Sequence, residues 1–279
     1  MNIDLHIHST CSDGTDAPLV LIEKIKENHI DVFSVTDHDN VDFYAQITPS
    51  DLEQLVLIPG IEFSCVTEAG KCHILGYGMD IQNDTLQKTI AQTQSLRREK
   101  LMKRISFLEE QYGIEFSEEE KNHLFSLKAA GKPHIAQVLV GKGLADSVDA
   151  AIKTYMKALP KGKDRIDAEA AIRAITAASG LPVWAHPLGG EGERHFSAAE
   201  FEKQLTVLKA FGIRGLECYY SRYTVGEIQY LLSEADKNNL LVSGGSDYHG
   251  TVKNIPLGTL CADTPDMEMN LTVLSSVLP

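Results

Sequence analysis

The first forty residues of the chain contain several side chains of the types that bind metal ions. His6 and His8 are separated by one residue in a short apolar segment, and Asp13 and the Asp-His-Asp run at 37–39 follow. Because successive side chains of a β-strand point to opposite faces, the two imidazoles are expected to lie on the same face. The opening residues therefore predict one corner of a metal site.

More residues of these types fall within or directly after segments that we expect to be strands. Such positions line one mouth of a parallel α/β barrel, so the side chains are expected to share one site. Any one of the histidines alone would more often be an ordinary hydrogen-bonded residue, but their common placement favours a metal centre. The expected ligands are His6, His8, Asp13, His38, Glu62, His73, His186, Asp247 and His249.

The ligand types narrow the choice of metal and of chemistry. Imidazole and carboxylate without thiolate suit manganese, iron or zinc, and this number of ligands predicts two or three divalent transition metal ions. Ions roughly 3.5–4 Å apart can activate a bridging water and hold both the attacking and the leaving oxygen of a phosphoryl group. The expected reaction is phosphoester hydrolysis, by in-line attack of a metal-bridging hydroxide.

The pattern of apolar residues indicates the elements that must position these ligands. Helical periodicity at 16–29, 198–211 and 225–238 separates several of the expected strands. Strands that alternate with helices favour an α/β fold with a mainly parallel sheet, either open or closed into a barrel. The seven expected strands lie at 3–8, 31–36, 56–63, 73–76, 182–186, 215–219 and 240–244.

The alternation breaks between the fourth and fifth strands, where 86–111 is expected to form one long helix followed by shorter ones. We therefore expect a barrel domain from 1–85 and 164–279, with a helical insertion at 86–163. The stretch 95–104 is locally basic and makes Arg98 a candidate for substrate binding. A solvated helix face is the alternative interpretation of this stretch.

Composition excludes several classes of protein. A net charge of −13 argues against binding of duplex nucleic acid, although a local basic site could hold a short phosphorylated ligand. The five cysteines contain no Cys-x-x-Cys pair, so free thiols are expected. Without an apolar run of about 18 residues or a signal peptide, we expect a cytoplasmic protein with no membrane partner.

The chain resembles the polymerase and histidinol phosphatase (PHP) superfamily of metal-dependent phosphoesterases. Four signature regions occur in order, as DLHIHSTCSDG at 4–14, TDHD at 36–39, AHP at 185–187 and GSDYHG at 245–250, with PGIE at 59–62 between them. Members of this superfamily have a distorted seven-stranded (β/α) barrel. The resemblance therefore implies a distorted (β/α)7 barrel, with the helical insertion capping the active-site mouth.

The same resemblance implies how the ligands are shared. One metal would be held by His6, His8, Glu62 and Asp247, a second by Asp13, His38 and His249, and a third by His73 and His186, with Glu62 bridging the third to the first. Asp13, His38 and Glu62 would thus be catalytic. Asp37 would orient a ligating imidazole. Glu217, on the sixth expected strand, could face the barrel mouth or form a hydrogen bond within the barrel.

The insertion and its Lys-Pro-His-Ile-Ala segment at 132–136 resemble the branch that acts on nucleotides. This implies a nucleoside 3′,5′-bisphosphate, or the 5′ end of a short oligonucleotide, as substrate. Lys132 and His134 would bind it, and His134 could also protonate the leaving oxygen or merely pack at a helix N-terminus. The alternatives are a phosphatase for histidinol phosphate or another small phosphomonoester, and a catalytically silent metal-binding module.

Overall fold

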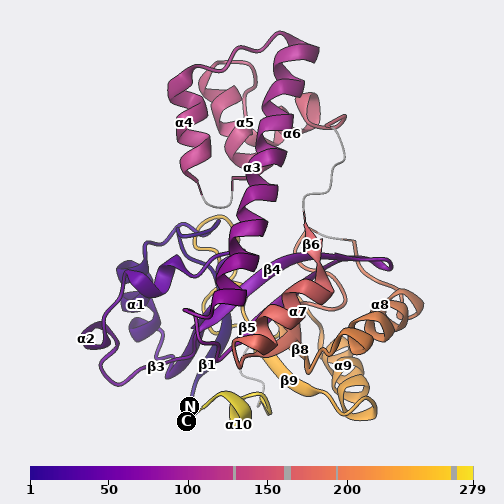
Figure 1. Cartoon of the computed structure of the whole chain (residues 1–279). Coiled ribbons are helices and arrows are strands. Elements are labelled where there is room, and N and C mark those ends of the chain that lie inside the picture. Colours follow the sequence, from indigo (N-terminus) through magenta and orange to yellow (C-terminus); the bar gives the residue numbers. More distant parts are fainter. Residues whose placement is uncertain (128–129, 160–164, 193, 265–268, 279) are drawn as a thin grey trace. The chain divides into compact units, whose positions relative to one another are not determined.

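The computed structural model describes residues 1–127, 130–159, 165–192, 194–264 and 269–278 (Figure 1). The chain divides into two compact units, one of residues 1–90 with 166–279 and one of residues 91–165. The long helix α3 (Asp84–Tyr112) crosses the first boundary. The helical insertion expected at 86–163 is a functional assignment that this division does not test, and it stays a prediction.

The first unit is the distorted (β/α)7 barrel that the sequence predicts. A parallel bridge between His38 and Glu62 joins β2 to β4, and a second between Ile7 and Tyr248 joins the β1 end to the chain after β9. These two contacts close the two hydrogen-bonded ladders into one ring. The ring strands are β1 (Ile3–Ile7), β2 (Val32–Val35), β4 (Gly60–Thr67), β5 (Gly70–Tyr77), β7 (Leu181–Trp184), β8 (Gly215–Tyr220) and β9 (Leu241–Gly245).

Two of the expected strands differ from the structure. The strand predicted at 56–63 is two strands, β3 (Val56–Leu57) and β4, because Pro59 lacks the N–H that a continuous ladder needs. The strand predicted at 73–76 extends to a tight turn at Thr67–Gly70, so that β4 and β5 form an antiparallel hairpin. β5 is also antiparallel to β7, so the ring is parallel except around β5.

Helices cover the outside of the ring. Within the first unit α7 (Ala168–Ala177) packs on β4, β5 and β7, and α9 (Val225–Lys237) packs on β8 and β9 (Figure 1). Serine and threonine N-caps with a glutamate three residues later start α8 (Ala198–Phe211) and α9. The remaining elements of this unit are α1 (Pro18–Glu27), the 3-10 helix η1 (Asp42–Ala45), α2 (Pro49–Leu52), β6 (Ile166–Asp167) and α10 (Leu274–Val277).

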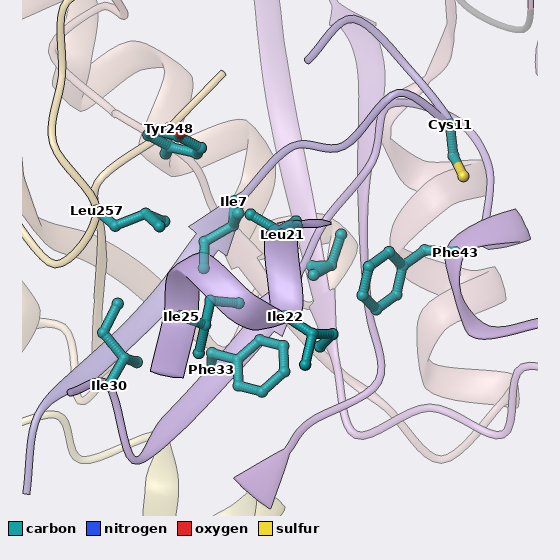
Figure 2. Packing of buried hydrophobic residues seen from close by; sticks show 11 residues of the cluster. Ile7, Cys11, Leu21, Ile22, Ile25, Ile30, Phe33, Phe43, Tyr248 and Leu257 are labelled. Atoms are coloured by element: carbon teal, nitrogen blue, oxygen red, sulfur yellow. The ribbon is translucent and has the colours of Figure 1, made fainter. Parts of the chain in front are cut away.

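A hydrophobic cluster holds the first two strands in place. The expected ligands His6, His8 and His38 lie in these strands or in the residues after them. Leu21, Ile22 and Ile25 of α1 pack against Ile7 of β1 and Phe33 of β2, and all five are buried (Figure 2). Along β1 and the residue after it, the side chains of Leu5 and Ile7 alternate with those of His6 and His8. Packing of the apolar face thus directs the imidazoles to the opposite face.

The second unit is helical. It contains most of α3, together with α4 (Glu118–Ser126), α5 (Lys132–Gly141) and α6 (Val148–Tyr155). Its own core includes Leu101, Leu108, Leu124, Ile135 and Leu139. Within the described parts of the chain, no helix is both long and apolar enough to cross a membrane.

Gly245 allows the close approach of β9 to β1. A Cβ at this position would lie 2.7 Å from Cα of His6 and would overlap its Cβ and backbone nitrogen. The approach is reinforced by a hydrogen bond from the Asp247 N–H to the His6 carbonyl, 2.8 Å long. A side chain at Gly245 would therefore separate two strands that carry expected ligands.

We expect Gly245→Ala to lower the free energy of unfolding by about 1–3 kcal/mol, because overpacking forces the two strands apart. Urea unfolding followed by circular dichroism measures this loss. Gly226→Ala is the matched control, since no described atom lies within 4 Å of a Cβ there. Equal stability of the two variants would contradict this account of the strand contact.

Candidate metal centre

All nine expected metal ligands lie together at one end of the barrel strands. They come from β1 and the loop after it, from the ends of β2, β7 and β9, and from the β4–β5 hairpin. Most are buried; Asp13 is the most exposed, with 34% of its side-chain surface accessible. The structure therefore brings together residues from both ends of the sequence, from His6 to His249.

Four ligand groups converge around His6 and His8. The Nε2 atoms of the two histidines lie 3.6 and 3.4 Å from Oδ1 of Asp247. They lie 3.4 and 3.3 Å from Oε2 of Glu62. This is the group of residues that the family resemblance assigns to a first metal.

A second group surrounds Asp13. Its Oδ1 lies 3.3 Å from Nε2 of His249, and its Oδ2 lies 3.8 Å from Nε2 of His38. His8 also approaches, with Nδ1 3.6 Å from Oδ1 of Asp13. The ligand atoms of these four residues all lie within 4.8 Å of one another.

Glu62 connects these residues to a third group. Its Oε1 lies 2.9 Å from Nδ1 of His73 and 3.1 Å from Nε2 of His186. Its other oxygen, Oε2, faces His38 at 3.0 Å as well as the first group. One carboxylate therefore presents each of its oxygens to a different set of imidazoles, as a bridging ligand must.

The distances and the unsatisfied atoms fit metal ions. Ligands about 2.1 Å from a tetrahedral ion are separated by about 3.4 Å, close to the spacing around His6 and His8. Among the described residues, His6 Nε2, His8 Nε2 and His38 Nδ1 are buried without a hydrogen-bond partner. A buried polar atom left unpaired costs about 1–3 kcal/mol, and a cation would satisfy all three.

The charges in the site also favour a cation. Burial alone would raise the pKa of Glu62, but the surrounding imidazoles, that of His38 foremost, hold this pKa well below its usual range. Burial alone would lower the pKa of His8, but the Asp247 and Glu62 carboxylates raise it to about 9. These directions favour an ionised Glu62, and a metal ion at His8 would compete with a proton there.

Glu217 forms hydrogen bonds with two of the expected metal ligands, His6 and His186. Its Oε1 is 2.8 Å from Nδ1 of His6, and its Oε2 accepts a hydrogen bond of 2.7 Å from the backbone N–H of His186. Of the two roles that the sequence left open for Glu217, the hydrogen bond within the barrel is the one observed. The bond to Nδ1 leaves Nε2 of His6 directed at the cluster.

Asp37 acts differently from the expectation that it would orient an imidazole. It accepts hydrogen bonds from the backbone N–H and hydroxyl of Ser9, at 2.8 and 2.6 Å, and from the hydroxyl of Ser12. Ser12 Oγ in turn lies 3.4 Å from Nδ1 of His8. Asp37 therefore orders the loop that carries Asp13 and reaches His8 only through a serine.

Three non-glycine residues of the site have positive φ angles, namely Asp39 (54°), His186 (28°) and Asp247 (57°). Such conformations cost on the order of 1–3 kcal/mol each and persist where the surroundings enforce them. The backbone N–H of His186 is held by Glu217, and that of Asp247 by the His6 carbonyl. The backbone at these two expected ligands is thus held in an uncommon conformation by neighbouring groups.

Two residues of the site were missed by sequence reasoning. The hydroxyl of Tyr220 donates to Oδ2 of Asp247 at 2.9 Å, and the ammonium of Lys253 donates to the same oxygen at 2.6 Å. The position of Tyr220 directly after the strand expected at 215–219 was the only feature of the sequence that could have indicated a place in the site. Lys253 lies in a loop, and no feature of the sequence indicated a place in the site for it.

The candidate substrate residues Arg98, Lys132 and His134 lie in the second unit. Lys132 is the first residue of α5, and Nδ1 of His134 accepts a hydrogen bond of 3.0 Å from the Gly131 N–H at the start of that helix. This is the packing role considered as the alternative for His134. The proposed substrate-binding and catalytic roles of these three residues stay predictions.

A barrel whose strand ends gather imidazole and carboxylate ligands defines a metal-dependent hydrolase. Residues 4–171 match the PHP domain model, and the chain belongs to the PHP domain family. The predicted family is confirmed, and the protein is a metal-dependent phosphoesterase of this family.

Curated relatives and a solved structure agree with this assignment. The chain is 31% identical to the 5′-3′ exoribonuclease Rnm of Escherichia coli K12, over 91% of this chain and 87% of the relative. It is 24% identical to the 3′,5′-nucleoside bisphosphate phosphatase of Chromobacterium violaceum, over 89% and 87%. A metal-dependent phosphoesterase structure from Bifidobacterium adolescentis superposes with a TM-score of 0.76 at 26% identity, over 94% and 93%.

We expect Asp13→Ala to lower phosphoester turnover by more than about 100-fold, because it removes a proposed ligand, whereas loss of an orienting group alone costs about 10–100-fold. Phosphate release and metal content measure the effect. The fold should persist, since Asp13 is partly exposed and lies in a loop. Asp236→Ala, at an exposed position in α9, is the control, and full activity of Asp13→Ala would refute the assignment.

Proposed function

We propose that the protein hydrolyses phosphate esters of nucleotides, either a nucleoside 3′,5′-bisphosphate or the 5′ end of a short oligonucleotide. The observation that carries the phosphoesterase chemistry is the position of Glu62 between two sets of imidazoles. The nucleotide part is supported by the relatives named as an exoribonuclease and as a nucleoside bisphosphate phosphatase. It is also supported by the side chains of the second unit.

The residues of the centre divide into an inner and an outer set. His6, His8 and Glu62 have at most 1% of their side-chain surface exposed, whereas Asp13 has 34% and His73 13%. We infer that a phosphoryl group approaches from the side of Asp13 and His73. The inner residues would then hold the fixed part of the metal centre.

Two or three divalent ions of manganese, iron or zinc, when bound by the nine ligands, would supply an activated water and neutralise charge on the phosphoryl oxygens. The chain itself supplies the geometry. Glu62 holds five imidazoles at fixed positions, and Glu217 holds the ring of His6. Because these groups are buried and closely packed, little reorganisation is needed during reaction.

The second unit has a cavity of about 430 Å³ whose chemistry suits a nucleotide. Arg97 and Arg98 of α3 line it together with Phe125 of α4, and the guanidinium of Arg98 lies 4.6 Å from the centre of the Phe125 ring. Guanidinium groups bind phosphate, and both guanidinium planes and aromatic rings stack on bases. In a chain with a net charge of −13, this is a locally basic site.

A comparison of substrates with metal-loaded protein tests the proposal. We expect kcat/KM for a nucleoside 3′,5′-bisphosphate or a 5′-phosphorylated trinucleotide to exceed that for histidinol phosphate by at least tenfold, since only the nucleotides offer a base to stack. Chelation should abolish phosphate release, and added Mn²⁺ should restore it. A preference for histidinol phosphate would refute the nucleotide assignment, and inactivity on every ester would favour a silent metal-binding module.

Lys132→Ala should mainly raise KM for a doubly phosphorylated nucleotide, because an ammonium that binds the second phosphate would be lost. Steady-state kinetics on the bisphosphate and on the corresponding monophosphate measure this difference. Lys153→Ala removes one exposed charge from α6 of the same unit and should leave both KM values unchanged. An unaltered KM in Lys132→Ala would place the phosphate contact elsewhere.

A further inference from the structure

The two oxygens of Asp247 have different surroundings. Oδ1 faces the histidines and lies 3.6 Å from Nε2 of His6, 3.4 Å from Nε2 of His8 and 3.4 Å from Nδ1 of His249. Oδ2 accepts hydrogen bonds from the Tyr220 hydroxyl and the Lys253 ammonium. Only one oxygen of this carboxylate is therefore directed at the metal centre.

One of the two donors to Oδ2, Tyr220, is itself held in place by a further hydrogen bond. Tyr220 is fully buried at the end of β8, and its hydroxyl accepts a hydrogen bond of 3.0 Å from the backbone N–H of Glu191. Lys253 lies in the loop after β9, and 19% of its side-chain surface is exposed. Asp247 itself has a positive φ and depends on its neighbours for its orientation.

We propose that Lys253, together with Tyr220, is a positioning residue of the metal centre that holds Oδ2 of Asp247 and leaves Oδ1 alone to bind a metal ion. The inference rests on the metal centre proposed above. A carboxylate restricted in this way binds through one oxygen rather than two. Orienting partners of this kind typically change metal affinity by about 10–100-fold.

The direction in which metal affinity changes when Lys253 is removed distinguishes a positioning role from a purely electrostatic one. An ammonium beside a cation site repels the cation, so if charge alone mattered, its removal would strengthen metal binding. If Lys253 positions Asp247, its removal releases the carboxylate from its orientation and weakens metal binding. The two accounts therefore predict opposite changes in Lys253→Met.

Titration of the metal-free full-length protein with Mn²⁺ tests this, with free Mn²⁺ followed by electron paramagnetic resonance. We expect Lys253→Met to bind one Mn²⁺ about 10–100-fold more weakly than the unaltered protein, and Lys253→Arg to recover most of the loss. Tyr220→Phe, which removes a donor without changing charge, should also bind one ion more weakly. Lys237→Met, which loses an ion pair with Glu234 in α9, is the control and should bind normally.

Turnover distinguishes this role from a direct contact with substrate. At saturating Mn²⁺ the phosphoesterase activity of Lys253→Met should return to within a few-fold of the unaltered enzyme. Equal or tighter Mn²⁺ binding by Lys253→Met overturns the proposal, as does activity that stays low at saturating Mn²⁺. If the unaltered protein binds no Mn²⁺, the proposed metal centre fails as well, and the inference falls with it.

Discussion

The buried carboxylate of Glu62 contacts five imidazoles through its two oxygens, those of His6, His8, His38, His73 and His186. These histidines come from four strands or the loops directly after them. The bridge between His38 and Glu62 is also where β2 meets β4 and the ring of strands closes. The contact that closes the barrel thus also brings together residues of the candidate metal centre. A shift of β4 by one residue would turn Glu62 away from the interior and separate the groups that it connects.

The site is stabilised by groups that touch no proposed metal. Glu217 holds His6 and the backbone of His186, and Asp37 holds the loop of Asp13 through Ser9 and Ser12. Asp4 accepts hydrogen bonds from the N–H groups of Ser246 and Gly258, both 2.8 Å long, and so connects β1 to the chain after β9. These buried carboxylates are all hydrogen-bonded, which offsets the cost of removing them from water. The apolar packing of α1 against β1 and β2 fixes the strands that carry or precede His6, His8 and His38 (Figure 2).

The candidate metal ligands and the proposed nucleotide-binding side chains lie in different units of the chain. The relatives carry the names of an exoribonuclease and of a nucleoside bisphosphate phosphatase, although this chain aligns with 87% of the length of each. A centre of imidazoles and carboxylates recognises a phosphoryl group and offers little to discriminate among the groups esterified to it. Discrimination needs stacking surfaces and further charges, and the Arg97, Arg98 and Phe125 side chains of the second unit have that chemistry.

The sequence alone identified the family and the alternation of strands and helices in the barrel, and it predicted the proposed ligand set, which the structure brings together. It could do so because period-two alternation puts His6 and His8 on one face, and because barrel strands deliver the residues at their ends to one mouth. Only the tertiary structure decided how β4 and β5 pair, since the apolar pattern separates the two strands but does not show that the turn at Thr67–Gly70 makes them antiparallel. It also decided the contacts of Glu217, Asp37, Tyr220 and Lys253. Those contacts join residues as much as 211 positions apart, as in the pair of His6 and Glu217, and no local pattern records a hydrogen bond formed across a barrel.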